Sequence, residues 1–226
     1  MSGDCSKQSL MKTFILLALL SFNSFAVEGL TIPNAFQVDL EGHVFRGKEP
    51  KSLVRELPEI GITDVIIFKN EVKGEVTKEI ADLKELGIKP HHIPFRWKDY
   101  PSFVEACEQT VEALKIIYKV KRAGGKVFFH CTAGEDRTGM LAGIYKMLEE
   151  NASVKEVFKN EMCGRGYSDG NIHKPAYVTG AIQRGLTPLF NALSAKVESG
   201  EWRLGKLSKK SCKDLVVEPT ELKCRR

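Results

Sequence analysis

Residues 130–139 read HCTAGEDRTG, and this stretch carries the most information about the fold. The apolar run Val127 to Phe129 just before it predicts a short buried strand, and the residues from Thr138 onward predict a helix. The stretch is therefore expected to be a turn between the end of a strand and the N-terminus of a helix. Backbone N–H groups point outward unpaired at such a terminus, and the helix dipole favours an anion there. We therefore expect an anion-binding loop at this point of the chain.

Strands and helices alternate on both sides of this loop. Strand patterns occupy residues 43–46, 64–68, 88–93 and 127–130, and helix patterns occupy residues 50–60, 75–86, 102–122, 138–150, 153–163 and 175–197. The last helix is expected to be interrupted near Pro188, and the helix over 138–150 is apolar nearly all round, which predicts that it is buried. The alternation predicts an α/β fold with a central, mostly parallel sheet flanked by helices, and with the loop between a strand and a buried helix.

The first 26 residues have the pattern of a secretory signal peptide. Lys12 precedes the apolar run 14–20, and a small-x-small site follows at Ser24 to Ala26. Met11 is an alternative start, and a core helix is the alternative interpretation of the run. The signal peptide predicts an exported protein, either periplasmic or secreted. It leaves one domain over residues 27–200 and a polar extension over residues 201–226 that is expected to trail over the surface.

Composition narrows the classes of partner. Hydrophobic residues make up 42% of the chain, which excludes disorder as the main state. The formal net charge is +5, which is compatible with an anionic ligand. No basic tract with interleaved aromatic residues occurs, so no nucleic-acid partner is expected. The apolar run near the N-terminus is too short to span a bilayer, so no stable membrane insertion is expected. No CxxC or HxxxH spacing predicts a metal site, and the oligomeric state stays open.

The chain has six cysteines, and Cys5 lies in the expected leader. Cys212 and Cys224 flank a polar segment and are candidates for a disulfide in an exported protein, although sequence alone leaves open whether their Cβ atoms meet. Cys107 lies on an apolar helical stripe and is expected to be a buried small hydrophobe. Cys163 has no assigned role.

The side chains of the loop fit nucleophilic chemistry on a phosphate. Cys131 is the strong nucleophile, and a helix N-terminus and a nearby cation lower the pKa of a thiol. Arg137, six positions later, offers a planar fork for two phosphate oxygens. Thr138 can hydrogen-bond the thiolate, and His130 can orient the loop and tune Cys131. The expected reaction is phosphoryl transfer to the cysteine followed by hydrolysis, with no metal or other cofactor.

The backbone of the loop is expected to bind the phosphate as well. Gly134 allows a tight turn that brings successive N–H groups round one centre. The expected phosphate-binding positions are Thr132, Ala133, Gly134, Glu135 and Asp136.

The pattern HCxxGxxRTG resembles the signature of the protein-tyrosine-phosphatase superfamily, the cysteine-dependent phosphatases with a Cys-x5-Arg loop followed by Ser or Thr. The resemblance spans roughly residues 43–165, and VFRGKEPKSLVRELPEIGITDVII (residues 44–67) looks like the opening of the compact dual-specificity branch. It implies a cysteine-dependent phosphatase domain over residues 27–200.

The superfamily also needs an aspartate on an upstream loop, which protonates the leaving oxygen. Asp99, in the proline-bracketed stretch PFRWKDYP (residues 94–101), is the candidate, since it lies 32 positions before Cys131 as in the compact branch. Asp64, at the start of a strand, and Asp82, on a helix, are less suitable alternatives.

An exported enzyme with this loop is similar to the phytase class, whose substrates are inositol polyphosphates. Arg96 and Lys98 are the expected substrate-binding cations beside the acid loop, with further cationic candidates at His91, His92, Lys69 and Lys73. One departure concerns Glu135 and Asp136, which place two carboxylates in the phosphate loop. Lipid-phosphatase relatives carry a basic residue at the position of Glu135, and the two acids either point away from the pocket or select against dense negative charge.

Two other functions remain open at this point. One is a protein tyrosine or dual-specificity phosphatase, so that the partner is either an anionic phosphorylated small molecule or a phosphopeptide. The other is a phosphate-binding module without catalysis. Such modules usually lose the nucleophile or the acid, whereas Cys131 and Asp99 are both present here.

Overall fold

The structure is a computed structural model, and it describes residues 27–224. The expected signal peptide, residues 1–26, lies outside the described residues, so that hypothesis stays a prediction. In the described part, no helix is both long enough and apolar enough to cross a membrane.

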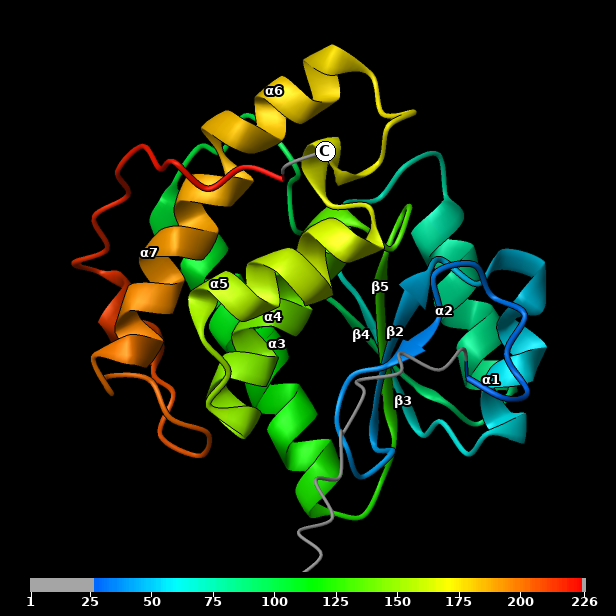
Figure 1. Ribbon diagram of the computed structural model, residues 1–226. Helices are drawn as coiled ribbons and strands as arrows, with labels where there is room; N and C mark the ends of the chain where they lie inside the picture. The colour runs from blue at the N-terminus through cyan, green and yellow to red at the C-terminus, as the bar shows by residue number, and fades with distance from the viewer. Residues whose placement is uncertain (1–26, 225–226) are drawn as a thin grey trace, which may run out of the picture.

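One five-stranded sheet runs through the molecule in the order β1-β2-β5-β3-β4 (Figure 1). The strands are β1 (Phe36–Gln37), β2 (Val44–Lys48), β3 (Asp64–Ile67), β4 (Lys89–His92) and β5 (Val127–Cys131). The short strand β1 is antiparallel to β2, and the other neighbours are parallel. All residues of β5, the central strand, are buried. This confirms the predicted α/β fold with a mostly parallel sheet.

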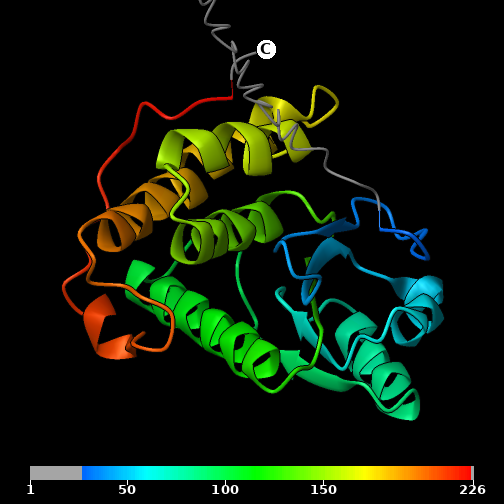
Figure 2. The same cartoon turned by 60° about the horizontal axis from the view of Figure 1, so that its bottom comes forward.

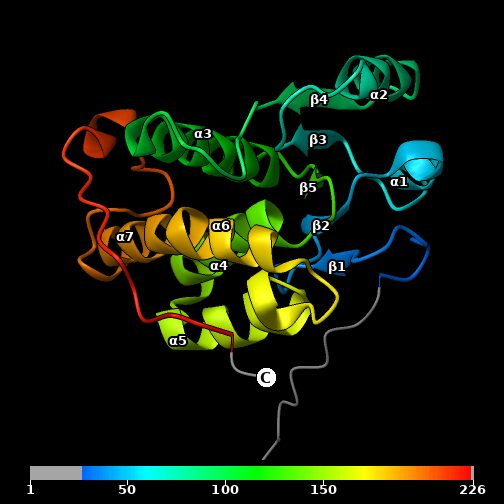
Figure 3. The same ribbon diagram turned by 90° about the horizontal axis from the view of Figure 1, so that it is seen from above.

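Helices cover both faces of the sheet (Figures 2 and 3). One face carries the 3-10 turn η1 (Lys51–Arg55), α1 (Glu56–Glu59) and α2 (Glu75–Glu85). The other carries α3 (Phe103–Arg122), α4 (Asp136–Glu150), α5 (Val154–Val157), α6 (Ala176–Arg184) and α7 (Leu186–Glu198). Each face has its own apolar core. As the sequence predicts, α4 is buried almost all round.

The alternation of side chains along β5 determines which face each residue serves. Phe128 belongs to the core under α1 and α2, and Phe129 belongs to the core under α3 and α4. Successive side chains of a strand point to opposite faces. His130 is therefore directed toward α2, whereas Cys131 is directed toward α4.

Several predicted helices are less regular than their patterns indicate. The segment expected to be helical over 50–60 is the turn η1 followed by α1, because Pro58 has no N–H to donate to the carbonyl of Val54 in a continuous helix. Residues 153–163 form α5 and then a π-helical turn, η2 (Phe158–Met162), and a 3-10 turn, η3 (Cys163–Arg165). Two further 3-10 turns are η4 (Ser168–Gly170) and η5 (Lys209–Cys212).

The break predicted near Pro188 lies instead at Gly185, between α6 and α7. Pro188 is in the first turn of α7. An N–H group needs no intrahelical partner there, so proline is tolerated.

Cys212 and Cys224, the two candidates for a disulfide with each other, do not pair together. Cys212 pairs with Cys107 of α3, and Cys224 pairs with Cys163 of η3, with Cα–Cα distances of 5.7 and 5.4 Å. Each cysteine finds a partner from a distant segment that the fold brings beside it. Cys107 is therefore a bridging residue and not only a buried hydrophobe, and Cys163 gains a role.

The C-terminal segment is also attached more firmly than its polar sequence predicts. Trp202 and Leu207 are buried in the same core as α3 and α4. The two disulfides attach Cys212 to α3 and Cys224 to η3. The expectation that residues 201–226 only trail over the surface therefore needs this correction for the part that the structure describes.

Candidate active site

The loop between β5 and α4 wraps closely against strand β2. Gly134 has a φ of +72°, and a Cβ atom at this position would lie 2.4 Å from the backbone of Gly47 and of Lys48. Only glycine combines this left-handed conformation with so close an approach. Gly134 therefore allows the tight turn that the sequence predicts, and the closeness of β2 is the reason that a larger residue does not fit.

The carbonyl groups of the loop are bound from outside it. The Asn34 side chain donates to the carbonyl of Ala133 at 3.0 Å, and the Glu49 amide donates to the carbonyl of Cys131 at 3.1 Å. Arg46 donates to the carbonyl of Gly134 at 2.8 Å. The amides of residues 132–135 donate to no group within the described residues. The loop thus has the polarity of an anion-binding nest, with carbonyls fixed outward and amides available.

Arg46 is held by a buried acid. Its guanidinium is fully buried in β2 and lies 2.5 Å from a carboxylate oxygen of Glu161 on the π-helical turn. An arginine inside a strand needs such a partner, because an unpaired buried charge is very costly. The pair attaches the phosphate loop to a segment thirty residues further along the chain.

Cys131 is the free cysteine of the described residues, and it is buried. Burial by itself raises the pKa of the thiol, but the positive charge of Arg137 and the hydroxyl and amide of Thr138 outweigh it, so the pKa lies below its usual value. The Thr138 hydroxyl has no other hydrogen-bond partner in the part of the chain that the structure describes, so it is available to the thiolate. Together these groups favour an ionised nucleophile.

Arg137 is positioned by two hydrogen bonds and lines the pocket beside the loop. Its guanidinium donates to the carbonyl of Phe95 at 3.1 Å and to the hydroxyl of Thr132 at 3.2 Å. Arg137 and Thr132 both line a pocket of about 350 Å³. Asp99 also lines this pocket.

Asp99 lies on the loop between β4 and α3, with a left-handed φ of +53° and a side chain 80% exposed. Its carboxylate is 3.8 Å from the ammonium of Lys98. The other two candidates for the acid do not line this pocket. Asp64 of β3 contacts His91 of β4. Asp82 contacts Lys78, and both of these residues lie on α2. The position of Asp99 therefore fits the expected general acid, although its role stays a prediction.

A metal-binding cluster is not part of the described site. Between residues 27 and 224, no group of three or more His, Cys, Asp and Glu side chains could hold a metal ion.

Comparison with known proteins agrees with this geometry. Residues 41–152 match the model of the tyrosine phosphatase family. The structure of Tk-PTP in the active form is similar, with a TM-score of 0.53 and 23% identity over 73% of this chain and 97% of that one. No curated protein sequence matches this chain.

The chain is a cysteine-dependent phosphatase of the protein-tyrosine-phosphatase superfamily.

Two further solved structures share the fold of this phosphatase. A cysteine-to-serine variant of TpbA from P. aeruginosa in complex with pTyr has a TM-score of 0.54 and 19% identity over 78% of this chain and 96% of that one. The core catalytic domain of the PP-IP phosphatase SIW14 from S. cerevisiae, in complex with citrate, has a TM-score of 0.51 and 20% identity over 75% and 95%.

The two carboxylates in the phosphate loop of this phosphatase bind a lysine. The ammonium of Lys174 lies 2.8 Å from Glu135 and 2.6 Å from Asp136. Asn171 also donates to Glu135, at 2.9 Å, and the amide of Ser168 donates to Asp136, at 2.8 Å. Neither carboxylate lines the pocket beside Arg137. The side chains of the two acids are therefore turned toward the segment before α6. Burial raises the pKa of Asp136 above its usual value, even though the charge of Lys174 acts in the opposite direction.

The structure brings only part of the predicted cationic rim to the pocket. The charged lining consists of Lys69, Arg96, Lys98 and Arg137 with Glu71 and Asp99. Lys69 is buried and forms an ion pair with Glu49, and it also lies 3.3 Å from Glu75.

The remaining rim candidates do not line the pocket. His91 contacts Asp64, and His92 hydrogen-bonds the carbonyl of Lys69 at 2.9 Å. Lys73 is not part of the lining either. Arg96 and Lys98 are thus the rim cations that the structure supports.

Sequence reasoning missed Glu161 and Lys174 as supports of the loop. Both lie beyond the signature, on segments whose local patterns show only helices and turns. One residue of the sequence does indicate such a support. Arg46 is a charged residue inside the buried strand VFRGK, and a buried arginine requires an acidic partner from another segment.

Proposed function

We propose that this phosphatase removes phosphate groups from an inositol polyphosphate. The observation that carries the proposal is the charge distribution round the pocket. Arg96, Lys98 and Arg137 contribute cations to its lining, while Lys174 compensates Glu135 and Asp136 away from it. A ligand with several phosphate groups needs cations beyond the one at the reacting phosphate.

The reaction follows from the arrangement of the loop. The Cys131 thiolate attacks phosphorus while the loop amides and Arg137 bind the non-bridging oxygens, and the bond from phosphorus to the leaving oxygen breaks. Asp99 donates its proton to that oxygen. Water then attacks the phosphocysteine, which releases inorganic phosphate and the thiolate, and the Asp99 carboxylate accepts the proton of the water.

A phosphotyrosine substrate is the second candidate, and the apolar lining of the pocket favours it. The half-buried Trp97 and the exposed Val72 line the same pocket as Asp99. An aromatic side chain such as Trp97 at this place suits the flat ring of a phosphotyrosine. The structures that share the fold include one bound to pTyr and one described as a PP-IP phosphatase, so the fold accommodates both chemistries.

A phosphate-binding module without catalysis is the least supported function. Cys131 and Asp99 are both present, and the surroundings of Cys131 lower its pKa. A binding module has no need for an ionised thiol.

We also propose that the protein is exported. The signal-peptide pattern of residues 1–26 carries this proposal, and the two disulfides support it because they persist in oxidising compartments. Fractionation of cells that express the full chain, with and without residues 1–26, tests it. Retention of the full chain in the cytoplasm would contradict export.

The substrate is tested by phosphate release from inositol hexakisphosphate and from a phosphotyrosine peptide in parallel, with Cys131→Ser as the blank. We expect a higher kcat/KM for the inositol substrate. The double variant Arg96→Ala/Lys98→Ala should raise KM for inositol hexakisphosphate and leave p-nitrophenyl phosphate hydrolysis nearly unchanged. A preference for the peptide supports the second candidate instead, and phosphate binding without turnover of either substrate supports the binding module.

A further inference from the structure

The inward face of α2 carries a carboxylate at a position where an apolar side chain is expected. Val76 and Leu83 on this face are buried, and Glu79 lies between them at helical spacing. The Glu79 side chain is only 10% exposed. A carboxylate so placed requires a partner, because burial of an unpaired charge is costly.

The partner is the histidine next to the nucleophile. The side chain of His130 is 0% exposed, and its Nε2 lies 2.8 Å from Oε1 of Glu79. Neither atom has a hydrogen-bond partner elsewhere in the described part of the chain. The two groups therefore depend on each other, across the face of the sheet opposite to Cys131.

The other nitrogen of the ring faces the nucleophile's own carbonyl. Nδ1 of His130 lies 3.4 Å from the carbonyl oxygen of Cys131, which also accepts a hydrogen bond from the Glu49 amide. Both ring nitrogens thus face oxygen atoms. An imidazole that donates from both nitrogens is the protonated, positively charged form. A positive charge beside Cys131 favours the thiolate.

We infer that Glu79 is a positioning residue for catalysis. It fixes the orientation and the charge of His130, and through His130 it prepares Cys131 for attack. This role concerns the nucleophile and does not depend on which phosphate ester is the substrate.

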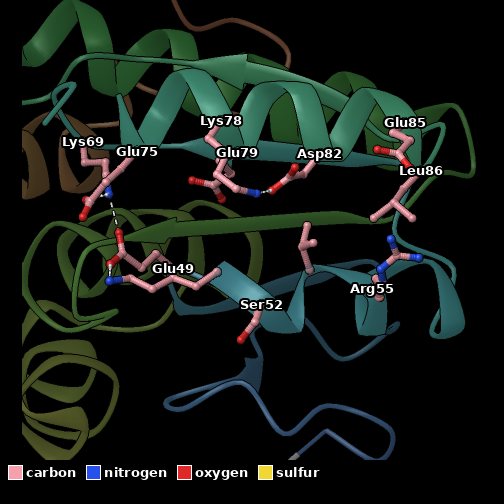
Figure 4. A pocket seen from close by; sticks show the side chains of 12 residues that line it. Glu49, Ser52, Arg55, Lys69, Glu75, Lys78, Glu79, Asp82, Glu85 and Leu86 are labelled. Atoms are coloured by element: carbon pink, nitrogen blue, oxygen red, sulfur yellow. Dashed lines mark hydrogen bonds and ion pairs between the residues drawn. The ribbon is translucent and has the colours of Figure 1, made fainter. Parts of the chain in front are cut away.

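The surroundings of Glu79 strengthen the inference. Glu79 lines a groove of about 420 Å³ between α2 and residues 49–55 (Figure 4). Four other charged groups of the groove form two ion pairs, since Lys69 binds Glu49 and Lys78 binds Asp82. Glu79 does not belong to these pairs and contacts His130 instead.

The test uses the variant Glu79→Gln, which keeps the size of the side chain and removes its charge. Asp82→Asn is the matched control, because Asp82 lies on the same helix and in the same groove but contacts only Lys78. The readout is the rate at which iodoacetamide alkylates Cys131 as a function of pH, which needs no substrate. We expect Glu79→Gln to move the midpoint of this profile upward by about one pH unit, so that alkylation slows about tenfold on the acid side. The control should keep the wild-type profile.

A double-mutant cycle separates positioning from packing. If Glu79 acts through His130, then Glu79→Gln should change nothing further in a His130→Gln background. An unchanged alkylation profile in Glu79→Gln, with or without a lower thermal stability, would overturn the inference. So would an equal shift in both backgrounds. Failure of the substrate assay leaves this measurement unaffected, because alkylation reports on the thiol alone.

Discussion

Nη2 of Arg46 donates a 2.8 Å hydrogen bond to the carbonyl oxygen of Gly134, and Nη1 of the same group lies 2.5 Å from the carboxylate of Glu161. One buried guanidinium therefore joins the central sheet, the phosphate loop and the π-helical turn. Arg46 lies 85 positions before Cys131 and outside the signature, yet it helps to hold the nucleophile loop in its shape.

Replacement of Arg46 should affect stability and catalysis together. Arg46→Met leaves the Glu161 carboxylate buried with less compensation, so we expect a loss of about 3–5 kcal/mol in the free energy of unfolding. Arg46→Lys retains a charge but loses the two-way fork, so its stability should fall less while kcat still drops. Urea unfolding and steady-state kinetics measure the two effects. Wild-type kcat in Arg46→Lys would show that the hydrogen bond to Gly134 is not needed.

The reactivity of Cys131 should depend on the Thr138 hydroxyl. Because the pKa of Cys131 is lowered, its thiolate should form below the pH of about 8.5 at which a free thiol is half ionised. Thr138→Ala removes one of the groups that lower this pKa, so the midpoint of alkylation should move to higher pH. Thr138→Ser keeps the hydroxyl and is the control. A midpoint in Thr138→Ala equal to that of the wild type would contradict this role.

Asp99→Asn should slow the step in which the leaving group departs. A missing general acid typically costs a factor of about 10²–10⁴. The loss should be large for an alkyl phosphate and small for p-nitrophenyl phosphate, whose leaving group needs little protonation. A comparison of kcat for the two substrates checks this. If both rates stay near wild type, Asp99 is not the general acid.

Lys174 should matter more for a dense anion than for a simple ester. Lys174→Met leaves Glu135 and Asp136 without their cation, so KM for inositol hexakisphosphate should rise severalfold while KM for p-nitrophenyl phosphate changes less. Lys174→Arg supplies a cation of similar reach and should restore most of the affinity. An equal change for both substrates would assign Lys174 to the shape of the loop instead.

The disulfide between Cys107 and Cys212 should stabilise the fold without touching the site. Cys107→Ala/Cys212→Ala should lower the free energy of unfolding by about 2–4 kcal/mol. Denaturation of the wild type with and without reductant should show a difference at least as large, because the reductant also opens the bridge between Cys163 and Cys224. The kcat of the double variant at low temperature should stay near wild type. Identical unfolding curves with and without reductant would contradict the pairing.

Much of the fold could be read from local patterns. Four parallel strands and the buried helix after the loop were predicted from apolar runs and periodicity, because burial against a sheet imposes these patterns on neighbouring residues. Geometry that depends on particular turns was predicted less well. The chain breaks at Gly185, between α6 and α7, and residues 154–165 form an irregular helix. The periodicity of the local sequence indicates neither feature.

The sequence by itself determined the nucleophile loop, since Cys131, Gly134, Arg137 and Thr138 lie within eight consecutive residues and act through a strand, a turn and a helix that the same residues form. The tertiary structure decided what surrounds that loop. It brings Arg46, Glu79, Glu161 and Lys174 to the loop from four other segments, and it pairs Cys107 with Cys212 and Cys163 with Cys224. These contacts join residues distant in the chain, and no local pattern of polarity specifies which distant charge or thiol becomes the partner.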